Sequence, residues 1–475
     1  MNVIVNGAGI GGLMSAILLG ADGHQVTVLE RDPAPTPDPD EAWDGWERRG
    51  VNQFRLPHFF LPRFLAIVRS ECPGLEDELD KAGMLHLNLI DIVPAEMTGG
   101  RRQGDEEFDL ITGRRSIYES VVAAFAQSMD RVTVRRGCAV AGLETGPSAA
   151  AGVPHVTGVR TESGERFEAD LVVDATGRRS PLPRWLADVS ADGPDEELED
   201  CGFTYYGRHF RSDDGSTPGI IAPLNSAYGS VNILTLPADN GTWSVVLVTS
   251  ARDSALRRFR DVDVWTDVIR AFPLVAHWLD GTALEENVTT MSKIEDRHRR
   301  YAASDGEPVA TGVVAVADSW ACTNPSLGRG ASMGALHSLA LRDVLRSGDS
   351  SDPAELVRGF NRVTDEVVEP WYRSTLAFDR HRLNEVQAVI DGRTYRPEGD
   401  AMWTLGNALN EAAGKDPDCL RALFAGVGLL RNPEDRFSDE TFAGKVLELG
   451  GEAANGQGAD GMGPDRRQLL EIVAG

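Results

Sequence analysis

The first thirty residues change their hydrophobic period twice. Residues 3–5 form a short apolar, β-branched run, which is typical of a buried strand. Residues 13–19 are apolar helix formers that follow a cluster of glycines, and residues 25–29 return to the strand pattern before Glu30. Two parallel strands need a crossover between them, and that crossover is usually a helix. The pattern therefore predicts a strand, a helix and a second, parallel strand.

Helical and strand-like patterns continue to alternate up to residue 180 and return near residue 313. Helices are predicted at 59–70, 114–127 and 334–345, and strands at 131–135, 139–143, 155–160, 166–168, 170–174 and 313–318. Ser116 and Glu119 stand three residues apart at the start of one of these helices, which is the spacing of a capping box. We expect the apolar runs at 170–174 and 313–318 to be buried strands of the parallel sheet.

The middle and the end of the chain differ from this pattern. Strands are predicted at 201–210, 219–223, 230–236, 243–249 and 285–293, a helix at 254–271, and a hairpin turn at 239–241. Helices are predicted at 353–368, 371–390, 402–413, 420–430 and 466–473, with a low-complexity stretch at 450–463. The pattern predicts a mostly antiparallel α+β insertion and a helical C-terminal extension.

The composition limits the size class of the fold and the kinds of partner that the protein is expected to bind. A chain of 475 residues is longer than a single hydrophobic core usually serves, so two or three structural units are expected. Hydrophobic residues make up 41% of the chain, which is enough to fill such cores. A net charge of −26 argues against a nucleic-acid partner and against docking on anionic membranes. Five scattered cysteines without a C-x-x-C pair favour neither disulfides nor zinc, which fits a cytoplasmic protein. No run is long and apolar enough for a membrane span, and the apolar N-terminus lacks the basic region of a signal peptide.

The glycine cluster gives the first chemistry. Gly7, Gly9 and Gly12 have the G-x-G-x-x-G spacing between a predicted strand and a predicted helix. Gly7 suits a tight turn, Gly9 lets the backbone approach a pyrophosphate, and Gly12 lets the helix pack on the strand. The helix N-terminus offers unpaired N–H groups to the phosphates, and Glu30 ends the second strand where an acid binds ribose hydroxyls. These features predict dinucleotide binding.

A second cofactor segment lies at 317–335. Here a predicted strand ends at Asp318, a loop carries Pro325, and Gly328 and Gly330 precede a helix. These glycines let backbone N–H groups come close to a ring or a phosphate, and the carboxylate suits the hydroxyls of a ribityl chain.

Together with 170–180, these segments resemble the class A flavoprotein monooxygenases, the superfamily with the para-hydroxybenzoate hydroxylase fold. The resemblance covers about residues 1–345 and is closest in motif detail to the squalene and polyether epoxidases. It implies an α/β fold: a GR2-type, Rossmann-like FAD domain with an inserted antiparallel α+β substrate domain and a helical C-terminal extension. The implied FAD domain comprises 1–75, 105–185 and 296–345, the substrate domain 76–104 and 186–295, and the extension 346–475.

The same resemblance implies the cofactor site. Arg115 stands where the family places an arginine that faces the flavin, and no catalytic residue is implied. The implied FAD-binding residues are Gly7, Gly9, Gly12, Glu30, Arg31, Arg49, Gln53, Arg115, Val140, Asp318, Gly328, Gly330, Ala331 and Ser332.

The expected function is that of an FAD-dependent monooxygenase. In the family, a C4a-hydroperoxide of the flavin transfers one oxygen atom of O₂, and here we expect a largely apolar organic substrate and either epoxidation or hydroxylation. Residues 174–177 read Asp-Ala-Thr-Gly instead of the hydroxylases' Gly-Ala-Asp-Gly, so NAD(P)H is expected as the electron source either directly or through a partner flavin reductase. The Trp-x-Trp-x-Ile-Pro motif of halogenases is absent. The alternatives are a flavin-dependent reductase of prenyl-type double bonds and a non-catalytic FAD-binding protein.

Three further candidates have simpler interpretations. His58 is expected to be a loop or core histidine instead of a group that faces the flavin or substrate. The basic run 297–301 is expected to be a solvated charge run instead of a phosphate site, and Cys322 a small buried residue.

Overall fold

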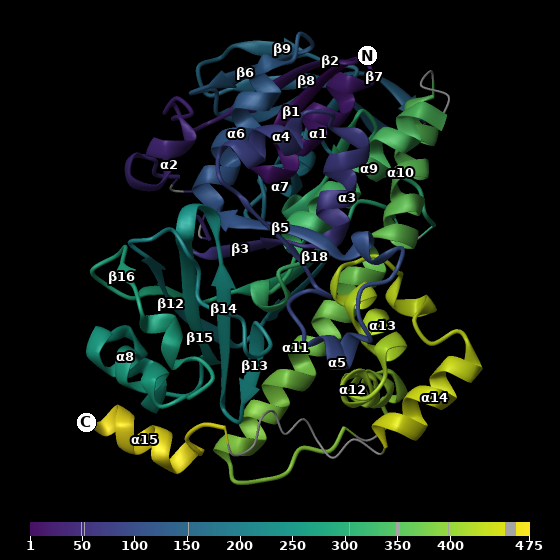
Figure 1. Cartoon of the computed structure of the whole chain (residues 1–475). Coiled ribbons are helices and arrows are strands. Elements are labelled where there is room, and N and C mark those ends of the chain that lie inside the picture. Colours follow the sequence, from purple (N-terminus) through teal and green to yellow (C-terminus); the bar gives the residue numbers. More distant parts are fainter. Residues whose placement is uncertain are drawn as a thin grey trace.

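A computed structural model gives the fold. It describes residues 1–48, 50–51, 53–150, 152–303, 305–347, 352–397, 399–451 and 462–475. The predicted α/β class is confirmed, with a parallel sheet and a helical C-terminal region. In Figure 1 the parallel sheet and its helices lie at the top, an antiparallel sheet at the lower left, and helices α11 to α14 at the lower right.

A five-stranded parallel sheet forms the centre of the upper part. Its order is β19-β10-β1-β2-β6. The strands are β1 (Asn2–Asn6), β2 (Gln25–Glu30), β6 (Val132–Arg136), β10 (Leu171–Asp174) and β19 (Val313–Ala315). Helices α1 (Ile10–Ala21), α6 (Arg115–Ser128) and α9 (Gly330–Ser347) lie near this sheet, and α1 packs closely on α9. The predicted first strand, helix and second strand are therefore all present.

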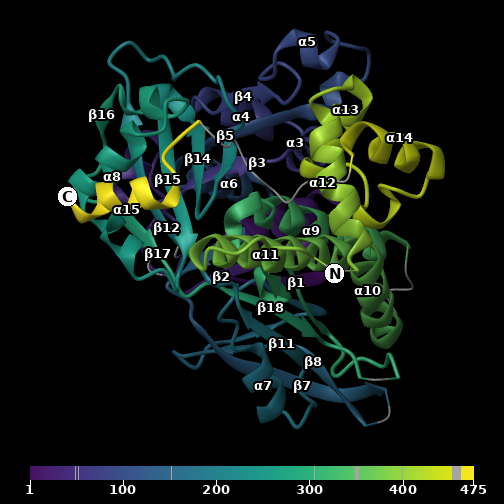
Figure 2. The same ribbon diagram turned by 90° about the horizontal axis from the view of Figure 1, so that it is seen from below.

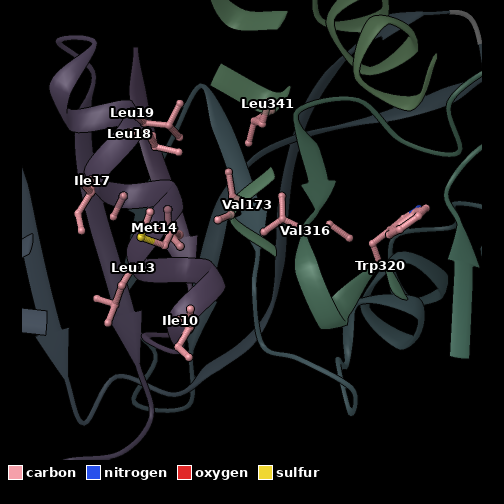
Figure 3. Packing of buried hydrophobic residues seen from close by; sticks show 14 of the residues in the cluster. Ile10, Leu13, Met14, Ile17, Leu18, Leu19, Val173, Val316, Trp320 and Leu341 are labelled. Atoms are coloured by element: carbon pink, nitrogen blue, oxygen red, sulfur yellow. The ribbon is translucent and has the colours of Figure 1, made fainter. Parts of the chain in front are cut away.

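Helix α1 is apolar on all sides because neighbours cover it on all sides. All its residues are buried except Gly11 and Ala21. Figure 3 shows part of this core, from the α1 side chains through Val173 to Val316. Each fully buried leucine or isoleucine here contributes about 1.5–3 kcal/mol of transfer free energy. A helix that is hydrophobic all round is a core element, and this burial fixes the position of the glycine turn that precedes it.

Smaller elements surround the sheet. β7 (Val140–Ala150), β8 (Val153–Thr161) and β9 (Arg166–Glu168) form the predicted meander. A second small sheet has the order β3-β5-β4, with strands β3 (Pro57–Phe60), β4 (Leu85–Asn88) and β5 (Asp109–Arg114). The remaining helices are α2 (Pro39–Gly45), α3 (Pro62–Glu71), α4 (Leu75–Lys81), α5 (Ala95–Thr98) and α7 (Leu182–Asp188). The helix predicted at 59–70 is thus a strand up to Phe60, and the helix begins at Pro62, where proline fits the first turn.

The inserted sheet is antiparallel, as expected. Its order is β13-β14-β15-β12-β16, and β17 also pairs with β12. The strands are β12 (Phe203–Arg211), β13 (Asn225–Tyr228), β14 (Val231–Pro237), β15 (Thr242–Ser250), β16 (Thr282–Ala283) and β17 (Thr289–Met291). Helices α8 (Val262–Arg270) and α15 (Arg466–Ala474) pack together, and both contribute to the hydrophobic cluster on one face of this sheet. Both figures show α15 beside α8 (Figures 1 and 2).

Three predictions in this region are wrong. The strand predicted at 219–223 is irregular in the structure, because Pro218 and Pro223 have no N–H group that could donate a hydrogen bond to a neighbouring strand. The helix predicted at 254–271 divides into a 3-10 segment at Ala255–Arg260 and α8, which begins after Asp261. The strand predicted at 285–293 is confined to β17.

A third small sheet contradicts the expectation for the basic run at 297–301. β18 (Glu295–Arg300) pairs antiparallel with both β11 (Asp195–Asp200) and β20 (Ala321–Cys322). His298 and Arg299 are 3% and 2% exposed, so the run is not a solvated charge run. The first three acidic residues of β11 lie opposite Arg300, Arg299 and His298 of β18, whereas its last two lie opposite acids. The favourable cross-strand pairs at the first three positions help two strongly charged segments to form a ladder.

The C-terminal region is helical, as predicted. Its helices are α10 (Pro353–Val367), α11 (Glu369–Ile390), α12 (Ala401–Ala413), α13 (Pro417–Val427), α14 (Glu440–Gly450) and α15. Helix α14 was not predicted from the sequence, and most of the low-complexity stretch lies outside the described residues. Figure 2 shows α11 running across the molecule from α10 toward the antiparallel sheet, which it contacts at β15. Over the described part of the chain, none of the helices has the length and apolar character to cross a membrane.

Candidate flavin site

The candidate site lies at the carboxyl edge of the parallel sheet. Register places the ends of β1, β2 and β10 together at this edge, and β19 ends beside β10. The loops that follow these strands carry the glycine turn, Glu30, the segment after Asp174 and the turn at Ala317–Ser319. Ligands of open α/β sheets bind at such an edge.

The three glycines of the first turn have different surroundings. Gly7 has φ +105°, and a Cβ there would lie 2.7 Å from the carbonyl oxygen of Ala175. A Cβ at Gly12 would collide with the carbonyl oxygen of Gly7. A Cβ at Gly9 would meet no described atom within 4 Å. Gly7 and Gly12 therefore serve the packing of the turn, whereas Gly9 borders open space at the N-terminus of α1, as a pyrophosphate site requires.

Glu30 is held by protein groups. Its Oε2 accepts hydrogen bonds from Ala8 N at 2.9 Å and from Arg48 Nη2 at 2.7 Å, and its Oε1 accepts one from Asp32 N at 2.9 Å. A carboxylate has about four acceptor positions, so one remains for a ribose hydroxyl. Arg48 was not identified from the sequence, because nothing in the local pattern distinguishes it from its basic neighbour.

Arg48 begins a chain of buried ion pairs. Its Nη1 donates to Glu119 Oε2 at 2.6 Å, and Glu119 Oε1 accepts from Arg115 Nε at 2.5 Å. Burial alone raises the pKa of Glu119, but the two arginines hold that pKa below its ordinary value. The capping-box prediction is wrong: α6 begins at Arg115 without a side-chain cap, and Ser116 is buried inside the helix.

Arg115 connects this chain with the segment that precedes β3. Its Nη1 lies 3.3 Å from His58 Nε2 and 3.4 Å from Gln53 Oε1. His58 Nδ1 donates to Leu56 O at 2.9 Å, so Nε2 is the acceptor. Burial and the neighbouring Arg115 lower the pKa of His58 to about 3. The histidine is therefore neutral, and it orients the guanidinium of Arg115 instead of transferring protons.

A strained turn positions Asp318. Ala317 has φ +51°, a conformation that costs about 1–2 kcal/mol for a residue with a Cβ. Its N–H donates to Nδ1 of the buried His337 at 3.2 Å, and His337 Nε2 donates to Thr364 Oγ1 at 3.0 Å. Ser319 Oγ accepts from Gly177 N at 2.8 Å, so the segments 170–180 and 317–335 meet here.

The Asp318 carboxylate faces the candidate site without a protein donor. Within the described ranges, no hydrogen bond to its side chain is formed, although Arg115 and Arg178 are near enough to favour its charged state. Burial acts more strongly in the other direction and raises its pKa. A half-buried carboxylate with free acceptors suits the hydroxyls of a ribityl chain.

The loop before α9 completes the arrangement. Gly328 has φ +66°, and a Cβ at Gly330 would meet no described atom within 4 Å. Ser332 is fully buried, and its Oγ has no partner among the described residues. The long helix α9 presents its N-terminus beside this open space, which again suits an anion or a polar ring edge.

The remaining predicted site residues include Ala331, which adjoins Gly330, and others for which no described contact with these groups exists. Arg31 is exposed, and its guanidinium lies against Gly50. Val140 is half-buried at the start of β7, and Ala331 is half-buried in the first turn of α9. Arg49 lies outside the described residues. Cys322 is buried in β20, and burial raises the pKa of its thiol well above the usual range, in agreement with a packing role.

One buried pair joins the small sheet β3-β5-β4 to the antiparallel sheet. Arg114 Nη2 donates to Asp239 Oδ2 at 2.6 Å, and the N–H of Arg114 donates to Asp239 Oδ1 at 2.7 Å. Arg114 ends β5 and precedes α6, while Asp239 lies in the turn between β14 and β15. The hairpin turn predicted at 239–241 therefore also anchors the antiparallel sheet beside Arg115.

Comparison with known proteins agrees with this geometry. The chain is 27% identical over 387 residues to protein Rv3254 of Mycobacterium tuberculosis, a match that covers 78% of each chain. It is 22% identical over 396 residues to the FAD-dependent monooxygenase fsr3 of Gibberella fujikuroi, covering 76% of this chain and 69% of that protein. No model of a known protein family matches the sequence.

The solved structures give the fold. PqsL of Pseudomonas aeruginosa, described as a probable FAD-dependent monooxygenase, superposes with a TM-score of 0.57 at 17% identity, covering 82% of this chain and 96% of that one. The chain therefore shares its fold with this probable FAD-dependent monooxygenase. The fold that the resemblance implied is thereby confirmed.

Proposed function

We propose that the protein is an FAD-dependent monooxygenase that transfers one oxygen atom from O₂ to a largely apolar organic molecule by epoxidation or hydroxylation. The observation that carries this proposal is the Asp318 turn. A strained backbone places a carboxylate that has no hydrogen-bond donor among the described residues at the same sheet edge as the open backbone at Gly9. Both features suit one extended dinucleotide, and the similarity to fsr3 supports FAD as that dinucleotide.

The chain's own groups account for binding and orientation. Gly9 and the N-terminus of α1 would take the pyrophosphate, Glu30 a ribose hydroxyl, and Asp318 the ribityl chain, while Arg115 faces the ring end. When bound and reduced, FAD supplies the activation of O₂. The protein must then exclude water and hold the substrate close to the ring.

The apolar substrate class rests on the antiparallel sheet. The face of this sheet that meets Leu56, next to the candidate site, carries a cluster of buried apolar side chains. Its members include Phe203, Tyr205, Val246, Val248 and Met291. His58, with a pKa lowered to about 3, is too weak a base to take a proton from a substrate at neutral pH. This suits oxygen transfer to a double bond, which needs no protein base.

The electron source is part of the proposal. Asp174 is buried, and its carboxylate accepts hydrogen bonds from Thr176 Oγ1 at 2.8 Å and from Ser180 Oγ. Asp174, which stands where the hydroxylase motif has glycine, therefore stabilises the loop that follows it. We expect electrons from NAD(P)H, delivered directly or through a partner flavin reductase.

A pair of glycine variants tests the cofactor assignment. Gly9→Val places a side chain in open space, so the protein should fold and lose FAD affinity by more than about 100-fold, as expected when a phosphate site is filled. Gly12→Val should instead destabilise the apoprotein, because its Cβ collides with Gly7. Flavin titration and thermal unfolding separate the two effects. A folded Gly9→Val protein that binds FAD like the wild type would exclude the assignment.

Oxygen dependence separates the alternatives. Oxygen consumption that is coupled to product in the presence of NAD(P)H supports a monooxygenase. Anaerobic saturation of a prenyl-type double bond would indicate a reductase. Bound flavin that neither NAD(P)H nor a partner reductase can reduce would indicate a non-catalytic FAD-binding protein.

A further inference from the structure

Two buried carboxyl groups lie beneath the glycine loop at 324–330. Asp296 on β18 and Asp379 on α11 are each 2% exposed. Asn324 lies between them: its backbone N–H donates to Asp296 Oδ1 at 2.8 Å, and its Nδ2 donates to Asp379 Oδ1 at 2.9 Å. Ser326 Oγ donates to the same oxygen of Asp379 at 3.0 Å. One carboxyl oxygen of α11 therefore accepts two hydrogen bonds from the start of the loop.

The loop is held from two other directions. Tyr205 on β12 donates its hydroxyl hydrogen to Asn324 Oδ1 at 2.6 Å. Farther along the loop, Arg329 Nη1 donates to Ser374 Oγ and Thr375 Oγ1 of α11, both at 2.9 Å. Helix α11 thus contacts the loop on both sides of Gly328. The antiparallel sheet joins the same network through Tyr205.

The second oxygen of Asp379 is not used by the loop. Oδ2 is buried and unpaired among the described residues. An ionised carboxylate in this position would lack compensation, because the titratable or charged groups that face it are Asp296, Tyr205, Cys201 and Arg329, and the described hydrogen bonds of Arg329 go to hydroxyl groups. Burial and the nearby Asp296 raise the pKa of Asp379 to about 8, and burial raises that of Asp296 to about 6.

We infer that Asp379 is a positioning residue of the flavin site, and that α11 of the C-terminal region completes this site by fixing Asn324 and Ser326. The inference rests on the proposed FAD binding by Gly328 and Gly330. The neutral carboxylic acid is the working form near neutral pH, since a proton on Oδ2 removes the uncompensated buried charge while Oδ1 still accepts both hydrogen bonds. When Asp379 ionises beside Asp296, the two charges repel each other and the loop loosens.

Three variants test the inference at one pH. Asp379→Asn keeps an acceptor oxygen without charge and should bind FAD within about two-fold of the wild type near neutral pH. Asp379→Ala removes the acceptor and should raise the dissociation constant about ten-fold. Asp391→Asn, an exposed substitution just beyond α11, is the matched control and should change nothing. An Asp379→Ala protein that binds FAD as tightly as the control would overturn the inference.

The pH profile distinguishes positioning from simple packing. For the wild type, the FAD dissociation constant should rise about ten-fold between about pH 7 and pH 9, because the loop loosens when Asp379 ionises. Asp379→Asn should lack this rise, and it also reports every other pH effect on the flavin. Identical profiles for the two proteins would contradict the positioning role.

A measurement without cofactor keeps this test separate from the proposed function. Hydrogen exchange of the loop amides at 326–330 in the apoprotein should be faster in Asp379→Ala than in Asp391→Asn. If the wild type binds no FAD, the proposed function fails, and the exchange result alone decides whether α11 holds the loop. Equal exchange in the two variants would show that it does not.

Discussion

Glu30 ends one strand of the parallel sheet and Asp318 follows another, yet the structure gives them different surroundings. Glu30 already accepts hydrogen bonds from Ala8, Asp32 and Arg48, whereas no described group donates to Asp318. Residues that bind only the cofactor should affect affinity alone. Residues that also hold the fold should affect stability as well.

This difference predicts opposite results for two alanine substitutions. Asp318→Ala should weaken FAD binding about 10–100-fold, or about 1.4–2.8 kcal/mol, and leave the stability of the apoprotein nearly unchanged. It should also raise the share of reducing equivalents lost as hydrogen peroxide, because a misplaced ring delivers oxygen poorly. Glu30→Ala should destabilise the apoprotein by about 3–5 kcal/mol, because it removes one of the two buried carboxylates that pair with Arg48. Urea unfolding and flavin titration measure both quantities.

If Asp318→Ala lowers stability and leaves FAD affinity and coupling intact, Asp318 serves the fold only. That result would remove the ribityl assignment.

His337 gives the turn at Ala317 a pH dependence. Burial lowers the pKa of His337 to about 3, while the unfolded chain binds that proton at about pH 6.5. The unfolded state therefore binds more protons between these values, so stability falls as the pH decreases below about 6.5. At pH 5 this loss is at most about 2 kcal/mol.

The variant His337→Leu cannot take up this proton. It should be less stable than the wild type at pH 7, because Ala317 N–H and Thr364 lose their partner. The deficit should shrink as the pH falls toward 5, which urea unfolding at several pH values can measure. A deficit that stays constant with pH would contradict a buried, neutral His337.

At the scale of elements, the ion pairs of Arg48, Glu119 and Arg115 join α6 to the loop that follows α2. Glu119 is the only described anion that pairs with both arginines. Removing it leaves two nearly buried cations without this partner. Glu119→Ala should therefore lower the free energy of unfolding by about 3–5 kcal/mol. Glu355→Ala, at a half-exposed pair on α10, should cost less than about 1 kcal/mol. Similar losses in the two variants would contradict the role of the buried chain.

Elements with one consistent local pattern were predictable from the sequence. The prediction of helix α1 and of the glycine turn agrees with the structure, because a helix that is buried on all sides has a continuous apolar run in its sequence. The role of Glu119 was not predictable, since its spacing from Ser116 imitates a cap while its partner Arg48 comes from 71 residues away. β11 and β18 were missed because charged strands have no hydrophobic alternation, and each is explained only by the other.

At the scale of the whole molecule, the candidate site draws on all three regions of the chain. The parallel sheet supplies the glycine turns and the acids, the antiparallel sheet supplies Tyr205, and α11 supplies Asp379. The glycine turns and acids of the parallel sheet belong to local sequence motifs and could be predicted. The other two contributions depend on contacts between residues more than fifty positions apart, which no local pattern encodes.

The central claim is that this arrangement serves oxygen transfer from O₂ through FAD. The most direct measurement is product mass spectrometry after turnover under ¹⁸O₂ with a panel of alkenes and aromatic compounds. The account predicts that a product gains one labelled oxygen atom, that FAD is required, and that the label is absent when only the water carries ¹⁸O. A product that takes its oxygen from water, or a reduced product formed without O₂, would contradict the claim.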